Sequence, residues 1–221
     1  MAVLTINGDI VTNDYGPMYD YYGWDAAWPA KVREAIDSKP EGEKLIVQIN
    51  SPGGIVTAGQ EIYSMLHERN DIEIQITGMA CSSASIIAMA GPCYMSEPAM
   101  MMIHNVSSYA DGDYHEMERT AETLKEINKA LANAYVTKTG KDLKEVLKMM
   151  DSETWIPAKE AIEQGFADGY IPREDNAVNA FGFDLRITKE QIKAFEDAKS
   201  KECNDKAQTK KLLDDLYLYG V

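Results

Sequence analysis

Apolar residues in the first hundred positions fall into short runs separated by stretches with helical spacing. A dense apolar run with β-branched residues at positions 45–49 is typical of a strand buried on both faces, and a second strand is predicted at 72–77. We expect the first run to end at Pro52-Gly53-Gly54 and the second at Gly78. The pattern also predicts strands at 3–6 and 99–103 and helices at 30–36, 56–66 and 85–90. This succession of strand, glycine-bearing turn and helix predicts an α/β domain with a mostly parallel sheet.

A long amphipathic helix is predicted at 114–139. Its apolar stripe has spacings of three and four residues, and charged residues fill the opposite face. The stripe consists of Met117, Ala121, Leu124, Ile127, Leu131 and Tyr135. Shorter helices are predicted at 142–150 and 157–164. Because the composition changes after Pro172, we expect a main domain at 1–173 and a mostly helical C-terminal appendage at 174–221.

Charge and cysteine content narrow the class of function. The 221 residues include 22 Lys and Arg against 36 Asp and Glu, a formal net charge of −14, so we expect neither nucleic acid nor an anionic membrane as partner. No apolar run would span a bilayer, and the N-terminus lacks the pattern of a secretory signal. Three cysteines without CxxC spacing argue against a disulfide framework and a zinc site. These features indicate a cytoplasmic protein without metal or cofactor.

The turn after the 72–77 strand carries a candidate nucleophile, Ser82. It precedes a predicted helix of small residues, where free backbone amides stabilise developing negative charge. Serine is also a common helix N-cap, so the local pattern leaves Ser82 either a nucleophile or a cap. We interpret its neighbour Cys81 as a packing residue.

His104 is the preferred general base by elimination among the three histidines. It directly follows the predicted strand at 99–103, next to a turn, and could project into a cleft. His67 falls at a predicted helix end, and His115 stands among acidic residues at a helix start. A lone histidine at the end of a strand could equally be a structural residue.

The remaining candidates are weaker. Gly53-Gly54 could present backbone amides to an anion, or form only a tight turn. Asp151 and Glu153 stand close together before Trp155, and either could orient a histidine or be an ordinary surface charge. The pattern alone does not choose between them.

Four segments, in this order along the chain, resemble the proteolytic subunit of Clp protease (ClpP). They are Ile49-Asn50-Ser51-Pro52-Gly53-Gly54, Gly78-Met79-Ala80-Cys81-Ser82, Met102-Ile103-His104-Asn105 and Glu153-Thr154-Trp155. The resemblance covers residues 44–171 and includes the ClpP-related head maturation (prohead) proteases of tailed bacteriophages and prophages. It implies the ClpP/crotonase-like spiral of repeated ββα units with a protruding handle helix.

Carried over residue by residue, the resemblance makes Ser82 the nucleophile and His104 the general base. Glu153 takes the place of the orienting acid, where the family usually has Asp, and Asp151 is kept as the second candidate. The backbone N–H groups of Gly54 and Ser83 become the oxyanion hole. The implied activity is hydrolysis of peptide bonds through an acyl-enzyme, without a cofactor.

The resemblance also implies partners. Polypeptides are the expected substrates, with capsid or scaffold proteins among them if the role is phage capsid maturation. We expect a homo-oligomer that forms a heptameric ring or stacked rings, and leave open an ATP-dependent unfoldase as partner. Two other functions stay open: a catalytically silent ring or scaffold subunit of the same fold, and a crotonase-like acyl-CoA enzyme.

Overall fold

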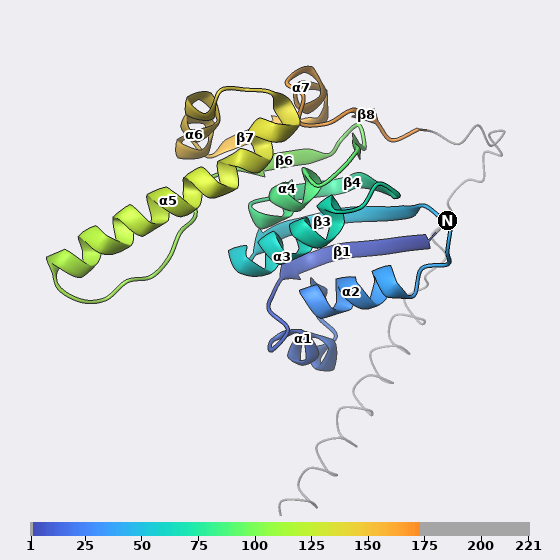
Figure 1. Cartoon of the computed structure of the whole chain (residues 1–221), viewed down its shortest axis with the longest axis horizontal. Helices are drawn as coiled ribbons and strands as arrows, with labels where there is room; N and C mark the ends of the chain where they lie inside the picture. Colours follow the sequence, from blue (N-terminus) through green and yellow to red (C-terminus); the bar gives the residue numbers. More distant parts are fainter. Residues whose placement is uncertain (1, 173–221) are drawn as a thin grey trace, which may run out of the picture. The chain divides into compact units, whose positions relative to one another are not determined.

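The structure is a computed structural model that describes residues 2–172 (Figure 1). Its strands are β1 (Ala2–Ile10), β2 (Ala26–Ala27), β3 (Leu45–Gly54), β4 (Ile72–Cys81), β5 (Cys93–Met95), β6 (Met100–Ile103), β7 (Thr154–Pro157) and β8 (Gly169–Tyr170). Its helices are α1 (Gly16–Tyr22), α2 (Pro29–Asp37), α3 (Val56–His67), α4 (Ser83–Ala88), α5 (Tyr114–Thr139), α6 (Leu143–Asp151) and α7 (Ala158–Glu163). The predicted appendage at 174–221 lies outside the described residues.

The strands form one sheet with the order β2-β1-β3-β4-β5-β8, and all pairs along this path are parallel. β4 has two partners beyond β3, because residues 74–76 pair with β5 and residues 79–81 pair with β6. β7 returns antiparallel to β6. This arrangement confirms the predicted α/β class with a mostly parallel sheet.

The central strands are buried as their aliphatic runs predict. Fully buried side chains from β3 and β4 include Leu45, Ile49, Ile72, Ile74 and Ile76. Helix α3 packs between α2 and α4, and in Figure 1 these three helices lie in front of the sheet. Removal of this apolar surface from water is the main force that stabilises the domain.

Two strands are longer than the predicted runs. β3 includes Pro52 and Gly53 and ends at Gly54, which still pairs with Ile10 of β1, because glycine accepts the positive φ of 98° at Gly53 and 151° at Gly54. β4 continues through Gly78, where a Cβ atom would collide with the side chain of Asn50. These glycines therefore allow close approach within the sheet. The elements α1, β2, β5, β7 and β8 were not predicted, because their sequences show no clear apolar periodicity.

Helix α5 has the predicted bounds and divides into two halves. It begins with a capping box between Asp113 and Glu116 and ends at Gly140, whose φ is 71°. Its C-terminal half packs against α4 and α6, and its N-terminal half projects from the domain beside the 104–113 segment (Figure 1). The predicted stripe is therefore only partly covered, since Tyr135 is buried and Met117 remains 39% exposed.

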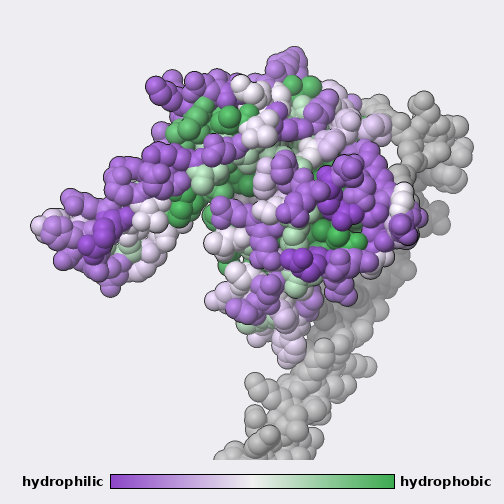
Figure 2. Space-filling model, viewed as in Figure 1, coloured by the Kyte–Doolittle hydropathy of each residue, from purple (hydrophilic) through white to green (hydrophobic). Residues whose placement is uncertain are grey.

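The hydropathy of the surface differs between the same two halves of α5. Figure 2 shows hydrophilic residues over much of the projecting end of α5 and hydrophobic residues gathered where the helix meets the domain. No helix within residues 2–172 has the length and apolar character needed to cross a bilayer.

Candidate active site

Ser82 lies in a strained turn between β4 and α4. Its backbone has φ 55° and ψ −127°, a conformation that residues other than glycine rarely adopt. The surrounding backbone holds it there, because the Ser82 amide donates to the Met102 carbonyl at 2.9 Å and the Ser82 carbonyl accepts from Ser85 Oγ at 2.6 Å. The Ser82 hydroxyl makes no capping bond to α4. The structure therefore does not support the interpretation of Ser82 as an N-cap.

His104 follows β6 at the same edge of the sheet. Cys81 of β4 pairs in parallel with Met102 of β6, so the residues that follow these two strands emerge side by side. His104 Nε2 lies 2.8 Å from Ser82 Oγ, which is hydrogen-bond distance. When Nδ1 carries the ring proton, Nε2 accepts the proton of the serine hydroxyl, and this is the geometry in which a base activates a serine.

The two polar neighbours of this pair are held neutral by burial. Burial raises the pKa of the Cys81 thiol, which disfavours the thiolate and removes it as a rival nucleophile. Burial also raises the pKa of the Tyr135 hydroxyl, which is hydrogen-bonded to Ser85 Oγ at 2.7 Å. A chain of hydrogen bonds thus runs from Tyr135 through Ser85 to the carbonyl of Ser82.

The end of β3 closes on the Ser82 turn. A Cβ atom added to Gly53 would lie 2.7 Å from the Ser82 Cβ and 3.2 Å from the Ser83 amide nitrogen. A Cβ atom on Gly54 would collide with the carbonyl of Ile10. Gly53 is therefore required for this close approach, which places it and the Ser83 amide beside the candidate nucleophile, whereas Gly54 lies against Ile10 of β1.

The two candidate acids lie on an exposed turn between α6 and β7. Asp151 accepts a hydrogen bond from Asn105 Nδ2 at 2.7 Å. Glu153 has a φ of 45°, and its carboxylate accepts from Trp155 Nε1 at 3.3 Å. Among residues 2–172, the hydrogen bonds include none between His104 and either carboxylate. The structure brings Ser82, His104 and Gly53 together, and neither candidate acid is hydrogen-bonded to His104.

Strand register nevertheless separates the two acids. In the antiparallel ladder of β6 and β7, Ile103 pairs with Thr154. The ladder ends at this pair, because the φ of 45° takes Glu153 out of the strand conformation, and His104 and Glu153 are the next residue of each segment. Asp151 instead bonds to Asn105, the residue after the histidine.

Two asparagines that the sequence analysis did not single out position the segment after His104. Asn105 bonds to Asp151, and its Oδ1 is buried without a hydrogen-bond partner among the described residues. Asn128 of α5 is 9% exposed, and its Oδ1 accepts from the Val106 amide at 2.8 Å. A signal for Asn128 existed in the sequence, because it lies four residues after Leu124 and so occupies a core position of the helix.

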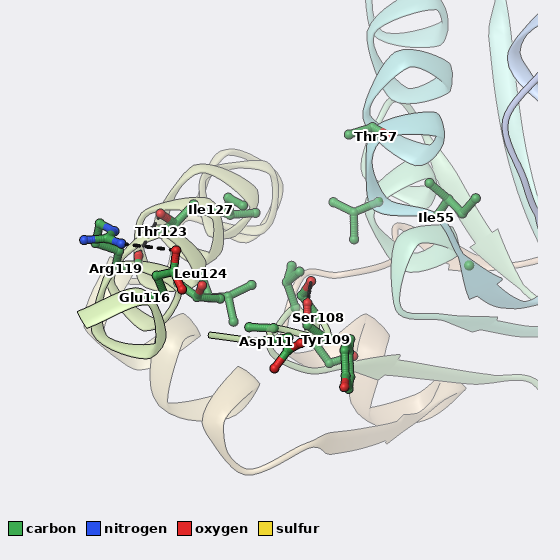
Figure 3. Close-up of a pocket in the computed structure, with 16 residues that line it drawn as sticks. Ile55, Thr57, Ser108, Tyr109, Asp111, Glu116, Arg119, Thr123, Leu124 and Ile127 are labelled. Atoms are coloured by element: carbon green, nitrogen blue, oxygen red, sulfur yellow. Dashed lines mark hydrogen bonds and ion pairs between the residues drawn. The ribbon is translucent and has the colours of Figure 1, made fainter. Parts of the chain in front are cut away.

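A groove of about 740 Å³ extends from this region along α5 (Figure 3). Its walls are the start of α3, the 106–111 segment and the projecting half of α5, with Leu124 and Ile127 on the helix side. A separate, smaller cavity borders on Ser82 and His104, and Val56 and Val106 line both spaces.

The other histidines lie elsewhere. His67 stacks on Tyr63 with its Nδ1 3.2 Å from the Ala90 carbonyl, and His115 packs against the ring of Tyr114. In the part of the chain that the structure describes, no group of three or more His, Cys, Asp or Glu side chains is placed to hold a metal ion.

Comparison with models of known protein families gives a match to the Clp protease over residues 34–174. The matched region includes β3, the Ser82 turn, β6 with His104, the handle helix α5 and the acidic turn before β7. It covers more than half of the 221 residues and all the candidate site residues. Members of this family are peptidases that form oligomeric rings and degrade polypeptides. The chain therefore belongs to the Clp protease family.

Proposed function

We propose that the protein is a serine endopeptidase with Ser82 as nucleophile and His104 as general base. The observation that carries the proposal is the 2.8 Å distance between Ser82 Oγ and His104 Nε2 in a chain of the Clp protease family. A serine hydroxyl is a weak nucleophile at its ordinary pKa and needs an adjacent base. The strained turn at Ser82 supports the proposal, because strain of this kind is typical of functional positions.

In the proposed reaction, Ser82 Oγ bonds to the carbonyl carbon of the substrate while His104 Nε2 takes the hydroxyl proton. The carbonyl oxygen becomes an oxyanion, which we assign to the backbone amides of Gly54 and Ser83. His104 then gives its proton to the leaving amine as the C–N bond breaks. Finally, His104 takes a proton from water as the water oxygen bonds to the acyl carbon, and it returns that proton to Ser82 Oγ as the ester C–O bond breaks and the acid product leaves. No metal or organic cofactor takes part in these steps.

We assign the orienting acid to Glu153, with Asp151 as the second candidate. The register of β6 and β7 supports Glu153, because His104 and Glu153 directly adjoin Ile103 and Thr154, the last pair of the ladder. To reach Nδ1 of the ring, the Glu153 carboxylate must exchange its bond from the Trp155 indole for one from the histidine. Since the side chains of Glu153 and Trp155 are both exposed, this exchange needs no change in the core.

Membership of the family supports a polypeptide as substrate. The groove leads from Gly54 at the end of β3 along the 106–111 segment to α5. We propose that the subunits form a heptameric ring, or stacked rings, around a chamber in the cytoplasm. The half-exposed apolar stripe of α5 is the surface that such contacts would cover. Maturation of phage capsid proteins is the physiological role that we propose from the sequence resemblance.

A fluorophosphonate probe tests the proposal, because it reacts only with an activated serine. We expect it to label Ser82 in the intact protein, as located by mass spectrometry of the labelled peptide. Ser82→Ala should remove the label, and Ser64→Ala, which changes an exposed serine of α3, should keep it. A correctly folded protein that is not labelled at Ser82, and that cleaves no unfolded polypeptide, would exclude the proposed activity and favour the silent scaffold.

A further inference from the structure

Helix α1 and the turn after it carry a group of exposed aromatic side chains. Tyr21, Tyr22 and Trp24 are 78%, 57% and 58% exposed, and Tyr15 and Met18 beside them are half-exposed. Single apolar side chains on a surface are ordinary, but a contiguous group of them is typical of a surface that binds a partner. We call these five residues the α1 surface.

The aromatic rings of this surface hold one another in place. Tyr22 and Trp24 stack with ring centroids 5.0 Å apart, and Tyr21 meets the ring of Tyr22 edge-on. Tyr19 meets Trp24 edge-on from the other side, and its hydroxyl donates to Asp9 Oδ2 at 2.9 Å. Because the rings are already ordered, little side-chain entropy is lost when a ligand binds to them.

The charge around the α1 surface has one sign. Residues 1–30 contain four aspartates and no Lys, Arg or His side chain. All four aspartates are exposed, and the ion pairs formed within residues 2–172 include neither Asp14 nor Asp25. Both the face of an aromatic ring and a carboxylate attract a cation, so this combination favours a ligand with positive charge.

The chain itself shows how such a surface holds a cation. The Nζ of Lys31 lies 4.4 Å from the centroid of the Trp28 ring and 3.6 Å from the Asp20 carboxylate. It also donates to the Ala26 carbonyl at 3.2 Å. Trp24 offers the same kind of ring, and within residues 2–172 no Lys or Arg lies over it.

The α1 surface lies at the same edge of the sheet as the candidate active site. Ile10, near the start of the segment that leads to α1, pairs with Gly54, and its carbonyl accepts from the Ile55 amide at 2.7 Å. Gly54 and Ile55 line the groove, and Figure 1 shows α1 beyond this end of β1. Since neighbouring strands are about 4.8 Å apart, β1 lies about 10 Å from β4, the strand that leads to Ser82. A few residues of extended chain cover such a distance.

We propose that the α1 surface binds the polypeptide substrate away from the reacting bond, through Lys or Arg side chains of the substrate. This inference rests on the proposed function. Charge favours a basic segment over a second copy of this chain, because each copy carries a formal net charge of −14 and the same acidic surface. Binding at a second point raises the effective concentration of the substrate at Ser82.

Binding is measured by fluorescence anisotropy on the full chain with Ser82→Ala, which leaves the probe intact. The probes are two fluorescein-labelled nonapeptides, one of alternating alanine and arginine and one with citrulline, a neutral isostere, in place of arginine. We expect the arginine probe to bind about tenfold more tightly. Trp24→Ala should weaken its binding about tenfold and Asp25→Asn about threefold. Tyr170→Ala and Asp37→Asn, which change exposed residues outside α1, are the matched controls and should leave Kd unchanged.

Cleavage is measured on the protein with Ser82 intact. Two quenched fluorescent peptides share one segment of casein that the protein cleaves, and they end in a tail of arginines or of citrullines. We expect kcat/KM to be about tenfold higher for the arginine tail through a lower KM, and Trp24→Ala should bring this ratio close to one. Because both rates are measured on one enzyme, a smaller fraction of folded protein cancels from the ratio.

Equal binding of the two probes would overturn the inference, and so would a Kd or a cleavage ratio that Trp24→Ala leaves unchanged. A fall in the assembled mass of Trp24→Ala would make the α1 surface a contact between subunits and would also overturn it. In each of these cases Ser82 still reacts with fluorophosphonate and casein is still cleaved. Failure of the proposed function would instead show as no labelling and no cleavage of either peptide.

Discussion

The nucleophile and the base of the proposed triad follow buried strands, whereas the two candidate acids stand on an exposed turn between α6 and β7. On the strand side, backbone pairing determines the geometry. Cys81 and Met102 pair across β4 and β6, the Ser82 amide bonds back to Met102, and His104 follows within 2.8 Å of the serine hydroxyl. The positions of Ser82 and His104 are therefore fixed by the backbone, because β4 and β6 are packed in the core.

On the acid side, flexible side chains determine the geometry. Asp151 and Glu153 bond to Asn105 and Trp155, and each is exposed to solvent. A hydrogen bond between exposed groups contributes little to the stability of the fold, so one such bond is easily exchanged for another. The difference teaches that one folded subunit builds the Ser82–His104 pair, whereas neither candidate carboxylate is hydrogen-bonded to His104 among the described residues.

Removal of the nucleophile should give the largest effect. We expect Ser82→Ala to lower kcat by about a million-fold, because loss of the serine in a triad abolishes the acyl-enzyme route. The circular dichroism spectrum and the oligomer size should match those of the original protein. Ser64→Ala should retain full activity. Appreciable cleavage of casein by Ser82→Ala would show that the strand side of the site is not the reaction centre.

The two acids should differ in effect. We expect Glu153→Gln to lower kcat/KM by about four orders of magnitude, because an amide favours the wrong histidine tautomer. Asp151→Asn should cost less than about tenfold, since an asparagine can still accept the bond from Asn105. Steady-state kinetics with one peptide substrate measures kcat/KM for both variants. A larger loss for Asp151→Asn would reverse the assignment, and small losses for both would indicate a Ser–His dyad.

The projecting half of α5 should control assembly. Met117→Asp places a charge on the exposed part of its apolar stripe, so we expect the assembled mass to fall toward the 24.6 kDa of one chain and activity to fall with it. Size exclusion with light scattering measures the mass. Ala130→Asp adds the same charge at an exposed position of the helix and should leave the mass unchanged. A fully active monomer would show that catalysis does not depend on assembly.

The effect of salt on the assembled mass is a second test of the contact between subunits. Because each chain carries a formal net charge of −14, added salt should favour assembly by screening the repulsion between subunits. Dissociation at high salt would mean that ion pairs hold the subunits together.

The smallest effect should come from the cysteine beside the nucleophile. Burial raises the pKa of Cys81, so its thiol stays neutral below that pKa and becomes reactive only as the pH rises above the usual range for thiols. We expect iodoacetamide at neutral pH to leave peptidase activity unchanged, and alkylation of Cys81 to accelerate at alkaline pH. Cys81→Ala serves as the control for label position. Rapid inactivation at neutral pH, absent in Cys81→Ala, would contradict this account.

Strong local signals made parts of the fold predictable. Helix α5 has the predicted bounds because a continuous apolar stripe lies between the Asp113 cap and the Gly140 stop. The interiors of β3 and β4 were predicted from their aliphatic runs, but their ends were not. Whether a glycine ends a strand or lets it bend depends on what lies opposite, and at Gly54 the opposite residue is Ile10, more than forty positions earlier in the chain.

By itself, the sequence determined the α/β class, the family and the identity of Ser82 and His104 as candidates, because motifs and periodicity are local. Only the tertiary structure decided that Ser82 is no helix cap, that it lies within reach of His104, and that Asp151 bonds to Asn105. The physical reason is strand register. The pairing of β4 with β6, and of β6 with β7, joins segments far apart in the chain, and neither segment alone specifies which residues will stand opposite each other.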